Sequence, residues 1–467
     1  MKGKRYISIC CLVFVILTVA CKQQKQEPNI LFIMVDDLGV RDLACYGQQY
    51  IQTPNMDRLS EEGMLWKNAY SSCPVCSPTR ASILTGKNPA RIHFTGHITA
   101  IEKHRHPESS TIIPPEDLMY IPFEEQTIAE VMKQAGYTTA HFGKWHVGGE
   151  GYWPIDQGFD LNIGGWTHGS PPAYFYPYER PGSSWNSSIP TLKGGVDGEY
   201  LPDRLTDEAI HFIKQQKGAP FFINLSYYAV HTPLQAPEGL IKKYEKIVPG
   251  TGIDPVYAAM VEKVDENVGR ILDLLDELRL KENTVVLLTS DNGGLETVTD
   301  NSPFRKGKGH LYEGGIRIPL IIRWPGFVKA GSVSWNRTVS MDLFPSMLDM
   351  AGVEYGNIKN LDGRSLLEDF SGITMEVQPD LYMYYPHYGI GQDPGSVIIS
   401  GRYKLIDHYD QVKTELFDLM NDEGETRDLS EEMPGIADSL KLKFYQWLES
   451  VGPIMHIQNP IYINNKK

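Results

Sequence analysis

Apolar runs and amphipathic segments alternate along most of this chain, at the lengths of strands and helices. Continuous apolar runs predict strands buried on both faces at residues 29–35 and 284–290, and further strands are predicted at 137–142, 220–226 and 318–323. Helices are predicted from residue 54, behind the N-cap candidate Thr53, and over 127–134 and 256–278. This alternation predicts an α/β fold, in which helices sandwich a large, mostly parallel sheet and the site lies at the carboxyl ends of the strands.

The pattern changes after Gly352. Residues 396–400 and 402–407 are typical of paired antiparallel strands that turn at Gly401, and a short strand is predicted at 415–419. An amphipathic helix follows over 436–451. We therefore predict a main domain over 29–352 and a smaller α+β subdomain, with a small antiparallel sheet and a helix, over 353–467.

The first 20 residues are typical of a secretory signal. A basic start (Lys2, Lys4, Arg5) precedes an apolar run over 7–20 that is too short for a stable membrane span. The run ends in Leu-Thr-Val-Ala before Cys21, which resembles a bacterial lipobox and implies lipidation of Cys21. Simple cleavage is the alternative. Residues 21–28 then form a polar tether, and we expect an exported Gram-negative lipoprotein, periplasmic or at the outer membrane, that meets the membrane through its lipid anchor only.

The amino-acid composition and the net charge exclude some classes of binding partner. Hydrophobic residues make up 41% and charged residues 22%, as in soluble globular proteins. The formal net charge is -14, so a nucleic-acid partner is not expected, and an anionic substrate requires a local gathering of basic side chains. The cysteines that remain behind the leader (Cys21, Cys45, Cys73, Cys76) indicate no disulfide framework. The C-x-x-C spacing of Cys73 and Cys76 permits a redox pair or half a zinc site, but no second cysteine pair supports zinc.

Acidic and amide side chains follow two of the predicted buried strands. Asp36 and Asp37 come after the first strand, and Asp291 and Asn292 come after the strand at 284–290. Neighbouring carboxylates repel one another unless a cation lies between them. Oxygen ligands of this kind favour calcium or magnesium over zinc.

A set of short motifs in fixed order resembles the type I sulfatases of the alkaline-phosphatase superfamily. The segment Cys76-Ser77-Pro78-Thr79-Arg80 matches their C-x-P-x-R signature, with Thr79 where Ser is commoner. The further matches are Gly143-Lys144-Trp145-His146, His231-Thr232-Pro233, Asp291-Asn292-Gly293-Gly294 and Lys308 to Gly315. The resemblance runs from about Asn29 to the last helix.

The resemblance implies a sulfuric ester hydrolase that acts through a modified cysteine. Cys76 is then oxidised by a maturase to formylglycine (3-oxoalanine), whose hydrate supplies the nucleophile. One calcium ion is held by Asp36, Asp37, Asp291, Asn292 and residue 76. Among the remaining residues, His231 and Lys308 assist the leaving group, His146 acts as a base, and Arg80 and Lys144 fix the formylglycine and the sulfate.

The motifs do not specify the sugar or the position of its sulfate. We expect a sulfated mono- or oligosaccharide, with galactose or N-acetylgalactosamine sulfate of host glycans preferred. The aromatic segment 152–185 is either a loop pinned by its own rings or a surface that faces sugar, and His97, Trp166 and His168 are the candidate substrate contacts. The basic cluster His93, His97, His104, Arg105 and His106 is either a solvated loop or part of a subsite.

Two other functions stay open on this reasoning. A phosphodiesterase or phosphonate-type hydrolase shares the fold, although most such relatives use Ser or Thr with two zinc ions. A glycan-binding lipoprotein that has lost catalysis is the alternative from another class.

Overall fold

The computed structural model describes residues 27–98, 110–183, 186–216, 218–389 and 394–465. The predicted signal over 1–20, the lipidation site Cys21, and the histidines at 104 and 106 lie outside this range and stay predictions. Among the described residues, no helix is both long enough and apolar enough to cross a membrane.

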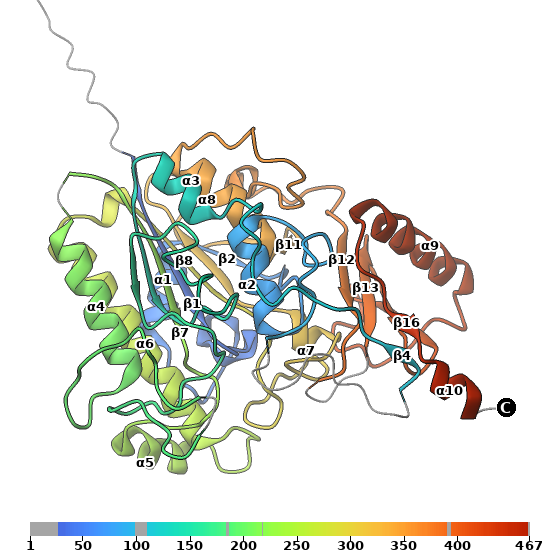
Figure 1. Cartoon of the computed structure of the whole chain (residues 1–467), viewed down its shortest axis with the longest axis horizontal. Coiled ribbons are helices and arrows are strands. Elements are labelled where there is room, and N and C mark those ends of the chain that lie inside the picture. Colours follow the sequence, from blue (N-terminus) through green and yellow to red (C-terminus); the bar gives the residue numbers. More distant parts are fainter. Residues whose placement is uncertain (1–26, 99–109, 184–185, 217, 390–393, 466–467) are drawn as a thin grey trace, which may run out of the picture.

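A central eight-stranded sheet organises the molecule (Figure 1). Its strand order is β10-β2-β9-β8-β1-β7-β5-β6. All neighbours pair in parallel except β9, which is antiparallel to both β8 and β2. The bounds are β1 Asn29–Val35, β2 Met64–Trp66, β5 Thr138–Gly143, β6 Leu161–Ile163, β7 Phe221–Tyr227, β8 Thr284–Ser290, β9 Leu320–Arg323 and β10 Ser332–Ser334. The predicted mostly parallel sheet is therefore confirmed.

Helices cover both faces of this sheet. On one face lie α1 Pro54–Glu62, α4 Leu201–Gln215 and α6 Pro255–Glu277, with α5 Glu238–Ile247 packed on α6. On the other lie α2 Cys76–Thr85, α3 Ile128–Gln134 and α8 Leu343–Ala351. Strand β1 is apolar from Ile30 to Val35 because both of its faces are covered. Leu31 and Ile33 pack in the core under α1, α4 and α6, and Ile30 and Phe32 pack in the core under α2, α3 and α8.

A second, antiparallel sheet forms the C-terminal subdomain (Figure 1). It contains β12 Leu381–Tyr385, β13 Gly395–Ser400, β14 Tyr403–His408 and β15 Lys413–Asp418, and α9 Pro434–Val451 packs on it. Its other face packs against Tyr70, Val75 and Leu311 of the main domain. Where one domain ends and the other begins stays a prediction. The smaller elements are β3 Ala69–Tyr70, β4 Ile112–Ile113, α7 Glu313–Ile316, β11 Thr338–Val339, β16 Ile457–Gln458 and α10 Pro460–Asn465.

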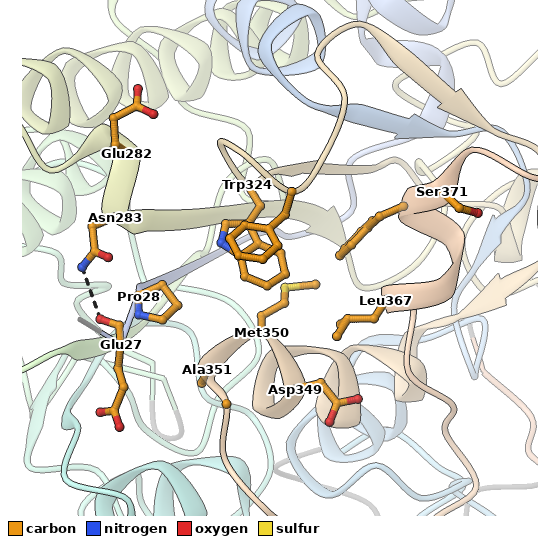
Figure 2. A pocket seen from close by; sticks show the side chains of 13 residues that line it. Glu27, Pro28, Glu282, Asn283, Trp324, Asp349, Met350, Ala351, Leu367 and Ser371 are labelled. Carbon is orange, nitrogen blue, oxygen red and sulfur yellow. Dashed lines mark hydrogen bonds between the residues drawn. The ribbon is translucent and has the colours of Figure 1, made fainter. Parts of the chain in front are cut away.

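The two ends of the parallel strands differ in character. At the amino ends of β1 and β8 lies a cavity of about 710 Å³, which Pro28, Asn283 and Trp324 help to line (Figure 2). Its walls are largely apolar, and the rings of Trp324 and Phe327 stack with centroids 3.8 Å apart. The carboxyl ends instead carry buried charge, and the candidate site lies there.

Candidate active site

The ends of β1 and β8 bring the two predicted acidic pairs together. The strands pair in register up to Val35 and Ser290, so the residues that follow each strand are neighbours. The backbone N–H of Asp37 donates to Oδ1 of Asp291 at 3.2 Å, and Nδ2 of Asn292 donates to Oδ1 of Asp37 at 2.9 Å. All four side chains are buried.

Helix α2 places Cys76 and Arg80 of the C-x-P-x-R signature next to these acidic residues. Cys76 is its first residue and Arg80 follows one turn later, so both point from the same side of the helix. Arg80 donates from Nε to Oδ2 of Asp291 at 2.8 Å and from Nη1 to Oγ of Ser226 at 2.6 Å. Nη1 also donates to the carbonyl oxygen of Lys144 at 3.1 Å. This single guanidinium therefore ties α2 to the ends of β5, β7 and β8.

Two lysines neutralise the first acidic pair. Nζ of Lys144 lies 2.8 and 2.7 Å from the two carboxylate oxygens of Asp36, and Nζ of Lys308 lies 2.7 Å from each oxygen of Asp37. Burial, and then Asp291, raise the pKa of Asp36, because Lys144 offsets them only in part. Burial also works to raise the pKa of Asp37, but Lys308 outweighs it and holds that pKa low.

The residues present fit a divalent cation. One ligand atom each from Asp37, Cys76 and His231 lies within a 4.8 Å cluster, and the same holds for Asp36, Cys76 and Asp291. Oδ1 of Asn292 is buried and has no hydrogen-bond partner among the described residues. A buried amide oxygen without a partner costs free energy, which a cation removes. Because carboxylate and amide oxygens dominate the set, it suits calcium better than a soft metal.

The two predicted catalytic histidines are both held as neutral rings. Nδ1 of His231 lies 2.8 Å from the carbonyl oxygen of Thr232, and its Nε2 lies 3.7 Å from Oδ2 of Asp37. Burial and Lys308 lower the pKa of His231 to about 3. Nε2 of His146 lies 3.0 Å from the carbonyl oxygen of Ile98, and burial, then Lys144, lower the pKa of this ring well below its usual value.

These contacts assign the ring protons. A carbonyl oxygen only accepts, so the facing nitrogen carries the hydrogen: Nε2 in His146 and Nδ1 in His231. The other nitrogen of each ring keeps its lone pair. In His146 this is Nδ1, which is buried and without a hydrogen-bond partner among the described residues. Nδ1 is therefore the atom of the His146 ring that is able to accept a proton, although burial and Lys144 disfavour the protonated ring.

The candidate substrate contacts lie around His146. The rings of His97 and His146 pack edge to face at 5.7 Å, the carbonyl oxygen of Trp166 accepts from the backbone N–H of His146 at 3.2 Å, and His168 packs on Trp166 at 4.3 Å. Their role in substrate binding stays a prediction. The His93 side chain instead contacts the C-terminal subdomain, where its Nε2 lies 3.0 Å from the carbonyl oxygen of Gly452.

The aromatic segment is largely pinned by its own rings, as the simpler interpretation expects. Phe159, Tyr174 and Tyr178 are buried, and Trp166 is only 8% exposed. Tyr174 donates its hydroxyl to the carbonyl oxygens of Tyr228 and His231, at 2.7 Å each, and so fixes the loop that presents His231. Tyr174 and the Ser226 partner of Arg80 are site residues that sequence reasoning missed.

Cys73 takes no part in either ligand group. It is buried, and its Sγ lies 3.7 Å from the carbonyl oxygen of Thr95. Cys45, Cys73 and Cys76 are all free thiols. This arrangement gives no support to a redox pair or a zinc site at Cys73-Cys76.

Comparison with known proteins agrees with this geometry. The sulfatase family model matches residues 28–353, and the model for the C-terminal region of N-sulphoglucosamine sulphohydrolase matches residues 306–449. The chain is 37% identical over 382 residues to N-acetylgalactosamine-6-sulfatase of Canis lupus familiaris, which covers 76% of this chain and 68% of that protein. It is 30% identical to a sulfatase of Formosa agariphila, over 91% of this chain and 90% of that protein.

Among solved structures, the complex of Ps i-CgsB with k-i-k-neocarrahexaose superposes with a TM-score of 0.79 at 26% identity, covering 94% of this chain and 97% of that one. The chain spans about two thirds of the length of the mammalian relatives that it matches. The family model matches most of the chain, and the fold is of the alkaline-phosphatase type with a cluster of buried charges at its strand ends. We conclude that this chain belongs to the sulfatase family, enzymes that hydrolyse sulfate esters.

Proposed function

We propose that this protein removes O-sulfate from sulfated mono- or oligosaccharides. The observation that carries the proposal is the placing of Cys76 against three buried carboxylates and two buried lysines at the carboxyl edge of the sheet. Relatives named N-acetylgalactosamine-6-sulfatase and a structural neighbour in complex with k-i-k-neocarrahexaose support a carbohydrate substrate. A galactose or N-acetylgalactosamine sulfate remains our preferred substrate.

The proposal includes modification of Cys76 to formylglycine by a maturase. Burial raises the pKa of the Cys76 thiol, although Lys144 and Lys308 oppose it, so the unmodified side chain is a protonated, weak nucleophile. Formylglycine, when present, supplies a hydroxyl nucleophile through its hydrate. The proposal also includes one calcium ion, held by Asp36, Asp37, Asp291, Asn292 and residue 76. When bound, it supplies positive charge that favours the deprotonated nucleophile and binds sulfate oxygen.

The chain's own residues then divide the remaining work. Lys144 and Lys308 place fixed positive charge where a sulfate group must enter. His231, on the loop that Tyr174 fixes, and Lys308 are the groups that assist the departing sugar oxygen. His146 presents the lone pair of Nδ1 as the base that completes turnover. Arg80 positions residue 76 by holding α2 on the sheet.

We also propose that the mature protein is an exported lipoprotein carrying its lipid on Cys21. The lipobox resemblance supports this proposal. Metabolic labelling with a radioactive fatty acid tests it: the wild-type chain should be labelled and the Cys21→Ser variant should not. Labelling of both, or of neither, contradicts it.

Sulfate release and intact mass test the function together. A panel of mono-sulfated sugars should give sulfate with the wild-type chain, and the peptide containing residue 76 should be lighter by about 18 Da when SH and H are replaced by a carbonyl oxygen. Cys76→Ser, made in a host whose maturase oxidises only cysteine, should be inactive with an unchanged thermal unfolding midpoint. Full activity in that variant without an aldehyde contradicts the mechanism. Hydrolysis of phosphonate or phosphate diesters only would instead favour the alternative hydrolase.

A further inference from the structure

A polar groove of about 320 Å³ lies between the active-site loop and the C-terminal sheet. We name it the basic groove. Its charged and titratable lining comes from both sides: Arg305, Lys306 and His310 from the loop that contains Lys308, and His408, Lys413 and Glu415 from β14 and β15.

Positive charge exceeds negative charge along this lining. Glu415 is the one carboxylate among the lining residues, and Arg305, Lys306 and Lys413 are three full cations. Nζ of Lys413 lies 2.8 Å from Oε1 of Glu415, whereas Nη1 of Arg305 is 3.9 Å from the same oxygen. Outside the lining, Oε1 of Glu296 forms an ion pair with Nζ of Lys306 at 3.7 Å and lies 3.8 Å from Nε2 of His310, so three cations still face two carboxylates. A cationic surplus in a chain of net charge -14 concentrates anions locally.

The groove also contains a buried ring with an unused nitrogen. His408 is 6% exposed, and its Nε2 lies 2.8 Å from Oε2 of Glu415. Its Nδ1 is buried without a hydrogen-bond partner among the described residues. Arg305 is held in place by stacking over Tyr312, with its guanidinium carbon 4.0 Å from the ring centroid. Arg305 and His408 are therefore held in place, while the side chains of Lys306 and Lys413 are partly exposed at the groove.

Residues of the basic groove stand next to Lys308 in the sequence. Lys306 and His310 are each two residues from Lys308, whose Nζ contacts Asp37 at 2.7 Å. Two residues span at most about 7 Å between Cα atoms. The same loop therefore contributes Lys306 and His310 to the groove and Lys308 to the active site.

We propose that the basic groove binds a second anionic group, a sulfate or a carboxylate, on a sugar next to the one that loses its sulfate. This inference rests on the proposed carbohydrate sulfatase function and adds that the preferred substrates are polyanionic oligosaccharides rather than isolated mono-sulfated sugars. The C-terminal subdomain then selects substrate through Lys413, while the main domain carries the chemistry.

The test compares four substrates with the same scissile sulfate: a monosaccharide, and disaccharides whose second sugar is neutral, sulfated or a uronate. The full chain is assayed as wild type, Lys413→Gln, and Lys306→Gln with Lys413→Gln. Lys242→Gln on α5 is the matched control for Lys413→Gln, because it removes one positive charge from a side chain that pairs with Glu238 on its own helix. The sulfated and uronate arms distinguish the two sources of anionic charge.

We expect wild-type kcat/KM to favour one anionic disaccharide over the neutral one. That preference should fall roughly tenfold in the double variant through a higher KM, as expected for loss of hydrogen bonds to a charged group, and should be unchanged in Lys242→Gln. Equal preference for neutral and anionic disaccharides in the wild-type chain overturns the proposal. So does a double variant that keeps the wild-type preference.

A binding measurement separates this proposal from the proposed function. If the wild-type chain releases sulfate from none of the four substrates, the sulfatase function fails, but titration calorimetry with the disulfated disaccharide still tests the groove. Weaker binding by the double variant than by Lys242→Gln supports the groove on its own. Equal binding by these two variants overturns it.

Discussion

Individual residues of the active site are held by opposite charge as much as by packing. Arg80 is 2% exposed and contacts Asp291, Ser226 and the carbonyl oxygen of Lys144. Removing one partner of such a buried set leaves the other charge unpaired, which costs several kcal/mol. Substitutions that keep the charge balance are therefore the informative ones, and His231, a neutral ring in this structure, is a suitable position.

His231→Ala should discriminate between leaving groups. A sugar alkoxide needs a proton as it departs, and the negative charge of a bound sulfate ester favours protonation of His231 at Nε2. The variant should therefore lose roughly 10²–10⁴-fold in rate on a sulfated sugar. An activated aryl sulfate needs far less help, and its rate should fall clearly less. Steady-state kinetics on both substrate types measure the difference. Equal losses would show that His231 binds the sulfate or the sugar, and Lys308, whose pKa Asp37 raises against the effect of burial, becomes the proton donor.

Gly169 offers a second test at the residue scale. A Cβ at this position would lie 2.3 Å from Cε1 of His146, and no strained backbone angle otherwise requires glycine there. Gly169→Ala should therefore displace the His146 ring and lower kcat roughly 10–100-fold, because small misplacements of catalytic groups are costly. Gly149→Ala is the matched control, since its nearest neighbour would be 3.9 Å away. Equal kinetics for the two variants would contradict the assignment of His146 as a base.

Most of the site residues were predictable one by one, because they stand in motifs of fixed order. Ser226 and Tyr174 were not. Ser226 is an ordinary residue of a buried strand until Arg80 reaches it, and Tyr174 is one aromatic among many until its hydroxyl meets the carbonyl oxygen of His231. Both contribute through contacts between residues far apart in sequence. Position in a motif carries no information about such partners.

At the scale of elements, the sequence predicted α1, α3, α6, α9 and most strands of the two sheets, but it missed α2, α4, α5 and α8. All ten residues of α2 are buried, so no polar face marks it as a helix, and its N-cap Val75 offers no side-chain acceptor. Strand β9 was predicted, but not its antiparallel direction, since apolar runs do not encode strand direction. Tertiary contacts decide both features.

The paired strands β4 and β16 give a prediction on pH at this scale. His456, just before β16, packs on Tyr384 and Tyr409, and burial lowers its pKa to about 4. The unfolded chain binds this proton near pH 6.5, so the folded state loses stability as pH falls from about 6.5 toward 4. His456→Phe keeps a ring but has nothing to titrate, and its unfolding midpoint should fall less than that of the wild-type chain over this range. Parallel pH profiles would contradict the assignment.

At the scale of the whole molecule, a buried ion pair joins the C-terminal sheet to the main domain. Lys404 of β14 is fully buried and contacts Glu313 at 3.0 Å and Glu425 at 2.7 Å. Glu313 begins α7, directly after the loop that carries Lys308 and part of the basic groove. The C-terminal subdomain is thus bound to the active-site loop, and the two parts are expected to unfold together.

The buried charges at the carboxyl edge of the sheet give a prediction about the stability of the whole molecule when metal is removed. Asp36, Asp37 and Asp291 face the three cations Lys144, Lys308 and Arg80 there, so these charges balance. The proposed divalent ion would add a partner for Oδ1 of Asn292, which has none among the described residues. A ligand that binds only the folded state stabilises it by mass action, about 2.7 kcal/mol at a hundredfold excess over Kd. Chelation should therefore lower the unfolding midpoint as well as activity, and calcium should restore both better than zinc.

Asn292→Ala separates this effect from general screening of the carboxylates. The variant keeps every charge of the site but lacks the amide oxygen, so its unfolding midpoint should rise less on addition of calcium than that of the wild-type chain. Scanning calorimetry at matched ionic strength, with magnesium and zinc as comparison ions, measures this rise without reference to turnover. The same rise in both chains would show that calcium acts elsewhere. Rescue of activity by zinc alone would contradict the oxygen-ligand argument and favour the phosphodiesterase alternative, because two-zinc hydrolases share this fold.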